Sequence, residues 1–192
     1  GEYPFWEDGY KLVETPYAGM EHQSAIAYGN GYTTSGHYYM YDLVDYIILH
    51  ETAHEWWGNS LTACDGADVW LHESFATFGE VLYVEEKLGR LVSIDYLKKK
   101  RSYISNKLPM VGPRNVNYWG FDDVYWKGAW VLHTLRSVIN NDDIFFKWLK
   151  ESQKKFRHSI ICSDEFIGFI NEETNIDLDY FFQQYLFDRK PP

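Results

Sequence analysis

The spacing of apolar residues changes along the chain near residue 41. In residues 1–41, short apolar runs are separated by Pro16 and Gly19, and the runs at residues 10–14 and 24–28 are typical of short strands. From residue 42 onward, apolar residues recur mainly at intervals of three and four, which predicts helices. The predicted helices span about residues 42–57, 68–88, 93–106, 122–140, 142–157, 163–174 and 177–187.

This order of elements predicts an α+β fold. Strands that come first and helices that follow favour a small N-terminal lobe with a sheet and a mostly helical C-terminal lobe. The 192 residues suffice for a single domain with lobes at about residues 1–60 and 61–192, and the helix at 42–57 lies where the lobes meet. We expect a binding cleft between them. Residues 107–121, which contain two prolines and two glycines, predict a long loop.

The composition narrows the class of ligand. A formal net charge of −10 argues against nucleic acid as a partner. The same charge favours a cationic ligand, such as the ammonium group of a peptide N-terminus. Aromatic residues make up 19% of the chain, which is more than a core of this size needs, so some are expected to line the cleft.

Cys64 and Cys162 leave two alternatives open. They form one disulfide, or they are two buried free thiols, which is the interpretation we favour. No apolar stretch is long enough to span a membrane and no signal-peptide pattern is present, so we expect no membrane span in this chain. The cellular location stays open.

The chemistry of the chain is concentrated in His50-Glu51-Thr52-Ala53-His54. On a helix, residues four apart differ by about 40° in azimuth, so His50 and His54 face one point and suit two corners of a tetrahedral zinc site. Glu51 is turned by about 100° from His50, where it can reach a water molecule at the metal without being a ligand. Eighteen residues separate His54 from Glu73, which can supply the third corner and leave the fourth position open.

The surrounding sequence supports this interpretation. Asp42 is a suitable N-cap for the first helix, and Asp68 is a suitable N-cap for the second. Glu73 lies among apolar residues of the second helix, where a buried carboxylate needs a partner. A metal ion is one such partner, and an arginine or lysine is the alternative. Glu80 lies seven residues later on nearly the same face, where it either hydrogen-bonds a ligand histidine or is a solvated surface acid.

The other histidines do not fit a metal site. His72 adjoins Glu73 but points about 100° away around the helix, so we do not expect it to be a fourth ligand. The remaining histidines have no ligand spacing with one another and are expected to be surface or satisfied core residues. They are His22, His37, His133 and His158.

Four short motifs follow one another along the chain. They are Gly19-Met20-Glu21-His22, then His50-Glu51-Thr52-Ala53-His54 with Glu55-Trp56-Trp57-Gly58-Asn59, then Trp70-Leu71-His72-Glu73-Ser74, and finally Tyr125-Trp126-Lys127-Gly128. In this order they resemble the motifs of the gluzincin zinc aminopeptidases, the family of alanyl (membrane-type) aminopeptidases and leukotriene-type epoxide hydrolases. The first resembles the family's Gly-x-Met-Glu-Asn exopeptidase motif, and the last resembles its Tyr-x-Lys-Gly motif.

The resemblance implies a thermolysin-like catalytic domain over residues 1–192, with a single zinc site between the two lobes. It implies that His50, His54 and Glu73 hold the zinc and that Glu51 is the general base of attack by a zinc-activated water. By the same resemblance, Tyr125 stabilises the oxyanion and Glu21 binds the free α-amine of a peptide substrate. The family's N-terminal β-domain and C-terminal domains would lie outside this chain, so we expect the isolated chain to bind zinc but to have low activity.

Two motifs depart from the family pattern. His22 stands where the family has Asn after the exopeptidase Glu, and His72 and Ser74 stand where it has Asn and Gly on either side of the third ligand. We expect these changes not to disturb zinc binding. The leading hypothesis is a metallopeptidase that removes N-terminal residues from peptides. The alternatives are an endopeptidase or epoxide hydrolase with the same zinc chemistry, and a non-catalytic scaffold that keeps the fold.

Overall fold

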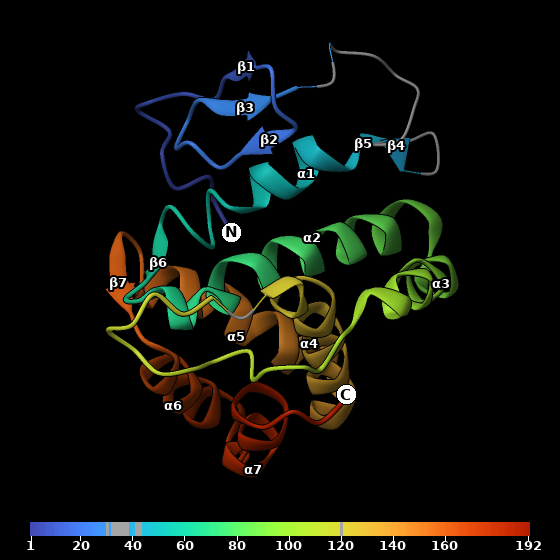
Figure 1. The fold of residues 1–192 in the computed structure, drawn as a ribbon, viewed down its shortest axis with the longest axis vertical. Helices are drawn as coiled ribbons and strands as arrows, with labels where there is room; N and C mark the ends of the chain where they lie inside the picture. The colour runs from blue at the N-terminus through green and yellow to red at the C-terminus, as the bar shows by residue number, and fades with distance from the viewer. Residues whose placement is uncertain (30, 32–38, 41–43, 120) are drawn as a thin grey trace.

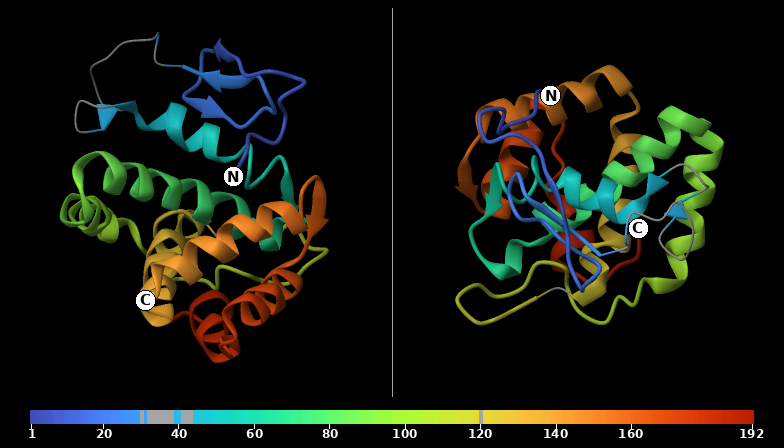
Figure 2. Two further views of the ribbon diagram at one scale, coloured as in Figure 1. Left: turned by 180° about the vertical axis from the view of Figure 1, so that it is seen from behind. Right: turned by 90° about the horizontal axis from the view of Figure 1, so that it is seen from above.

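A computed structural model describes residues 1–29, 31, 39–40, 44–119 and 121–192. A small sheet lies at one end of the molecule, a bundle of helices occupies the other end, and α1 (Tyr46–Ala53) runs between them (Figure 1). The view from behind in Figure 2 shows the same order, with α2 (Trp70–Leu88) directly beneath α1. The α+β fold with two unequal parts is therefore confirmed.

The small sheet has the order β1-β3-β2, and its strands are β1 (Leu12–Glu14), β2 (Gly19–Met20) and β3 (Ile26–Tyr28). The central strand β3 is buried along its whole length, and it pairs in parallel with β1 and antiparallel with β2. The runs predicted at residues 10–14 and 24–28 contain β1 and β3. The sequence did not predict β2, because a strand of two residues carries no periodic pattern.

Helix α1 is shorter than the helix predicted at residues 42–57. Its N-cap is Asp45, whose side chain accepts a hydrogen bond from the backbone N–H of Ile47 at 2.9 Å. The predicted cap, Asp42, lies outside the described residues. Residues 44–45 form β5 (Val44–Asp45), which pairs with β4 (Tyr39–Met40), so the backbone is extended immediately before the helix. The chain leaves the helix after Ala53 in a series of turns.

Helix α2 is the central helix of the larger part. It packs against α1, α3 (Arg90–Lys100) and α4 (Trp126–Ile139). The prediction that Asp68 caps it is wrong, because the N-cap is Val69 and the Asp68 side chain points elsewhere. Asp68 is fully buried and accepts hydrogen bonds from the Arg114 guanidinium at 2.7 and 2.8 Å. The Asp68 carboxylate therefore pairs with Arg114 of the 107–121 loop instead of capping α2.

The remaining helices close the larger part, and their bounds lie close to the predicted ones. They are α5 (Asp142–Lys155), α6 (Ser163–Thr174) and α7 (Asp179–Phe182), which continues as a π-helical segment η4 (Gln183–Phe187). Short 3-10 turns η1 (Gly66–Asp68), η2 (Arg101–Tyr103) and η3 (Phe121–Val124) precede α2, follow α3 and precede α4. Aromatic rings from α2, α5 and α6 meet in the core; these are Phe75, Trp148 and Phe166. None of the helices in the described part of the chain is both long and apolar enough to cross a lipid bilayer.

The preference for free thiols is wrong, because Cys64 and Cys162 form a disulfide with Cα atoms 5.1 Å apart. The bond follows β6 (Leu61–Ala63), which pairs in parallel with β7 (Ser159–Ile161), and it precedes α6. Nothing local brings the two cysteines together, since they are 98 positions apart in the sequence. Only the pairing of β6 with β7 places them side by side.

We expect the double variant Cys64→Ser, Cys162→Ser to be less stable by about 4 kcal/mol, because closing a loop of this length restricts the unfolded chain. In a protein of this size that corresponds to a fall in Tm of roughly 8–16 °C. Calorimetry with and without a reductant measures the effect. The variant itself should not respond to the reductant, and an equal Tm for both proteins would contradict a stabilising role.

Candidate active site

A cavity of about 370 Å³ opens between the sheet and the large helices. Residues that are distant in the sequence line it from four directions. They are Gly19, Met20 and Glu21 from β2 and the residue after it; Ile47, His50, Glu51 and His54 from α1 and its end; Glu73, Thr77 and Glu80 from α2; and Trp119, Tyr125 and Trp126 from the loop and the start of α4. The predicted location between the two lobes is therefore where the cavity lies.

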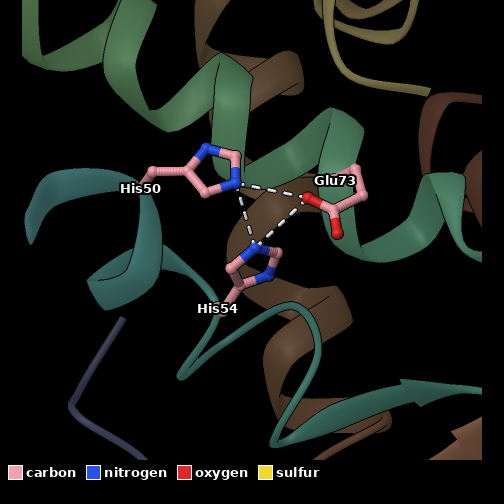
Figure 3. A group of neighbouring side chains, drawn as sticks. All are labelled: His50, His54 and Glu73. Carbon is pink, nitrogen blue, oxygen red and sulfur yellow. Dashed lines mark hydrogen bonds and ion pairs between the residues drawn. The ribbon is translucent and has the colours of Figure 1, made fainter. Parts of the chain in front are cut away.

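Three side chains converge on one point in this cavity (Figure 3). Nε2 of His50 is 3.1 Å from Nε2 of His54 and 3.2 Å from Oε2 of Glu73. The third edge, from Nε2 of His54 to the same Glu73 oxygen, is 3.3 Å. The spacing of four residues on α1 brings the two imidazoles together, and the packing of α2 against α1 adds the carboxylate.

Hydrogen-bond acceptors beside the two Nδ1 atoms determine which nitrogen of each imidazole carries the proton. Nδ1 of His54 is 2.9 Å from the backbone carbonyl of Trp57, and because a carbonyl only accepts, this nitrogen must donate. Nδ1 of His50 lies 2.8 Å from Oε1 of the buried Glu80. In each neutral imidazole, Nε2 is then an unprotonated lone pair that faces the others. Two lone pairs and a carboxylate at this distance require a positive charge between them.

The electrostatics of the triad agree with this requirement. Burial lowers the pKa of His50, but hydrogen bonds with Glu73 and Glu80 outweigh it and raise the pKa to about 10. Burial raises the pKa of Glu73, yet the two histidines hold that pKa well below its usual range. The site therefore retains either a proton on His50 or another cation.

A tetrahedral metal ion fits the three groups. Metal–ligand bonds of about 2.0–2.1 Å imply edges of roughly 3.3 Å between the ligand atoms of a tetrahedron, and the observed edges are close to this value. Two imidazole nitrogens and one carboxylate are also a donor set that zinc accepts in hydrolytic sites. A competing arginine, the alternative partner for Glu73, is not what the described structure shows, because the Glu73 carboxylate faces the two histidines.

Glu51 lies beside the triad and is almost fully buried. Burial raises the pKa of its carboxyl, which His50 and His54 oppose only in part. Strand β2 approaches α1 closely and covers the Glu51 carboxylate. A Cβ on Gly19 would lie 2.6 Å from Oε1 of Glu51 and 2.5 Å from a methyl group of Ile47. Gly19 is therefore required for this approach.

Tyr125 immediately precedes α4 and faces the same cavity. Its ring stacks on His50 at 5.8 Å, and burial followed by the charge of Glu73 raises the pKa of the phenol, so it remains a neutral donor. Gly128 allows α4 to approach α2, because a Cβ there would lie 1.8 Å from the Ser74 hydroxyl. Ser74 in turn donates to the backbone carbonyl of Val124, just before Tyr125.

Glu21 follows β2 and lies at the cavity wall, half-buried. One of its carboxylate oxygens lies within 4.8 Å of ligand atoms of Glu51 and His54. The Asn59 side chain donates to the Glu21 backbone carbonyl at 2.9 Å. All the sequence-predicted site residues, which are those of the four motifs together with Glu80, therefore line one cavity.

Sequence reasoning missed Tyr96, and the structure places His72, His22 and His158 outside the triad. Tyr96 on α3 donates to the carboxylate oxygen of Glu80 that does not contact His50. No local pattern in the sequence indicates this contact. His72 accepts a hydrogen bond from the backbone N–H of Ala63 at 2.8 Å and is not a fourth member of the triad. His22 is exposed and His158 stacks on Phe5. His37 lies outside the described residues.

Residues 8–185 match the peptidase family M1 domain. Among named relatives, an aminopeptidase N from Streptomyces lividans is 28% identical over an alignment of 151 residues that covers 72% of this chain and 18% of that protein. A leucyl aminopeptidase from Saccharolobus solfataricus is 26% identical over 182 residues, covering 87% of this chain and 23% of the relative. The chain thus spans less than a quarter of the length of these relatives.

The fold also matches solved structures. An M1 zinc metallopeptidase from Deinococcus radiodurans superposes with a TM-score of 0.75 at 23% identity, covering 95% of this chain and 40% of the other. Leukotriene A4 hydrolase from Saccharomyces cerevisiae superposes with a TM-score of 0.76 at 21% identity, covering 95% and 32%. At this identity the superpositions show the fold alone.

Proposed function

The chain belongs to peptidase family M1, and we propose that it carries the active site of a zinc-dependent aminopeptidase, which removes single amino acids from the free N-termini of peptides. The family confirms the resemblance that the four motifs indicated. The observation that carries the proposal is the meeting of the triad, Glu51, Tyr125 and Glu21 in one cavity. The names of the relatives, aminopeptidase N and leucyl aminopeptidase, agree with it.

In this proposal His50, His54 and Glu73 hold one zinc ion, the metal named for the Deinococcus radiodurans neighbour. When bound there, zinc lowers the pKa of water and polarises the carbonyl group of the bond to be cleaved. Glu80 orients His50 by accepting from Nδ1, and the Trp57 carbonyl does the same for His54. Both contacts keep the Nε2 lone pairs directed at the point where the three side chains converge, where the ion would bind.

Glu51 is the proposed general base. Its carboxylate takes a proton from the attacking water and delivers it to the amine that leaves, so the carboxylate is regenerated in each cycle. Its raised pKa suits this double role, because a base with a pKa nearer to neutrality also protonates the leaving group effectively.

Tyr125 is the proposed oxyanion donor. We expect Tyr125→Phe to lower kcat about 100-fold with little change in KM, since the phenol hydrogen bond strengthens only as the carbonyl oxygen becomes negative. Steady-state kinetics on an aminoacyl chromogenic substrate measure both constants. Phe keeps the ring that stacks on His50, so zinc content should not change, and an unaltered kcat would remove Tyr125 from the reaction.

Glu21 is the proposed anchor for the substrate ammonium group, through a charge-assisted hydrogen bond. The test compares an aminoacyl chromogenic substrate with its N-acetylated form in the full-length, zinc-loaded protein. We expect a preference for the free amine of about 10²-fold or more, most of which Glu21→Ala should abolish through KM. Equal cleavage of blocked substrates would indicate an endopeptidase, and a zinc-loaded but inert protein would indicate a scaffold.

We propose that residues 1–192 form one thermolysin-like catalytic unit of a longer protein, with a sheet-containing part at about residues 1–60 and a helical part at about 61–192. The proposal is supported by the coverage of the relatives, which leaves most of their length unmatched. Peptides with a free N-terminus are its proposed substrates. The other domains of the same protein are its proposed structural partners, and activity of the isolated chain is expected to be low.

A further inference from the structure

The segment that carries Glu21 is held from outside the sheet. Strand β2 ends at Met20, so the ladder that pairs it with β3 stops one residue before Glu21. The turn that follows contains Ser24 in a left-handed conformation with φ of 58°. Such a conformation is uncommon for residues other than glycine and needs support from its surroundings.

Two residues that follow the zinc ligand His54 give this support. The Asn59 side chain donates to the backbone carbonyl of Glu21 at 2.9 Å. Oε1 of Glu55, which is fully buried, accepts from the backbone N–H of Ser24 at 2.6 Å. The turn is therefore held at Glu21 itself and again three residues later, at Ser24, by the segment that leaves α1.

The same segment is fixed relative to the triad. The backbone N–H of Asn59 donates to the backbone carbonyl of His54 at 2.9 Å. This hydrogen bond fixes the backbone of Asn59 relative to a proposed metal ligand. A single short path thus runs from His54 through Asn59 to Glu21. The distance between the proposed ammonium anchor and the metal position depends on this path.

We infer that Asn59 is a positioning residue that holds the Glu21 carboxylate at the distance from the metal that single-residue cleavage requires, with Glu55 as a second support. This inference rests on the proposed function of Glu21. The position of the Glu21 carboxylate matters because its charge-assisted hydrogen bond to the substrate ammonium group depends on distance and direction. Asn59 acts through Glu21 and does not touch the substrate.

The test uses the full-length, zinc-loaded protein with Asn59→Ala and Asn59→Asp. Alanine removes the side chain, whereas aspartate keeps its size but removes the donor. The matched control is Thr62→Val, because the Thr62 hydroxyl donates to the Gly58 and Asn59 carbonyls in the same turn but does not reach Glu21. Each protein is assayed with free and N-acetylated aminoacyl substrates, and binding of L-tryptophan and N-acetyl-L-tryptophan is measured by calorimetry.

We expect both Asn59 variants to raise KM for the free-amine substrate about 10-fold and to weaken L-tryptophan binding by a similar factor, because a displaced Glu21 loses part of its charge-assisted hydrogen bond to the ammonium group. Their kcat and zinc content should stay within about twofold of wild type, and Thr62→Val should behave as wild type. If Asn59 and Thr62 variants change alike, or if kcat and zinc fall while KM is unchanged, the inference is overturned. A wild-type protein that does not distinguish free from blocked amines overturns the proposed function itself, whereas a Glu21-dependent preference untouched by Asn59 overturns only the positioning role.

Discussion

Replacing Glu51 with alanine is expected to lower kcat by about 10³-fold or more while the protein keeps one zinc ion. The reason is that Glu51 faces the cavity beside the triad but contributes none of the three converging ligand atoms. Its loss removes the group that accepts and returns the proton, and no other group needs to move. Steady-state kinetics and elemental analysis of the same preparation measure the two quantities.

The isosteric variant Glu51→Gln serves as the control for volume. It fills the space beneath Gly19 that alanine would leave, so it tests whether a cavity or the missing base causes the loss of activity. We expect both variants to be equally inactive. If zinc is lost together with activity, Glu51 is a ligand and the assignment of roles at this site is wrong.

Replacing Glu73 with alanine is expected to reduce zinc below one ion per chain and activity below detection. Only two imidazoles would remain to bind the metal, and a zinc site of this kind needs three protein ligands. The variant also leaves two lone-pair nitrogens 3.1 Å apart without the carboxylate that balances a cation between them. Elemental analysis after dialysis, followed by titration with zinc, measures the change in affinity.

Replacing Glu80, on the same helix as Glu73, is expected to have a smaller effect on zinc affinity. We expect Glu80→Ala to weaken zinc binding by roughly 10–100-fold, because it orients His50 without touching the metal. Glu86→Ala is the matched control, since Glu86 is an exposed acid of α2 beyond the cavity lining. The order of effects should be Glu73, then Glu80, then Glu86, and a Glu80 variant with wild-type affinity would separate it from the metal site.

Several elements could be predicted because their causes are local. Helix α6 lies at Ser163–Thr174, as its apolar spacing predicted, and α5 ends within two residues of its predicted bound. The positions of β1 and β3 followed from short apolar runs between turn residues. The predicted start of a helix was less accurate where the predicted cap residue binds another part of the chain. Asp68 was predicted as a cap, but Arg114 from a distant loop binds it.

By itself, the sequence determined the family, the α+β order of elements and the convergence of His50 with His54, because a four-residue spacing on a helix is a local geometric relation. Only the tertiary structure decided which atoms meet Glu73, that Cys64 pairs with Cys162, that Tyr96 contacts Glu80 and that Asn59 contacts the Glu21 backbone. These contacts join segments that lie far apart in the chain. They arise from how α2 packs against α1 and α3, how β2 lies against α1, and how β6 pairs with β7. Packing leaves no periodic signal in the residues that it brings together.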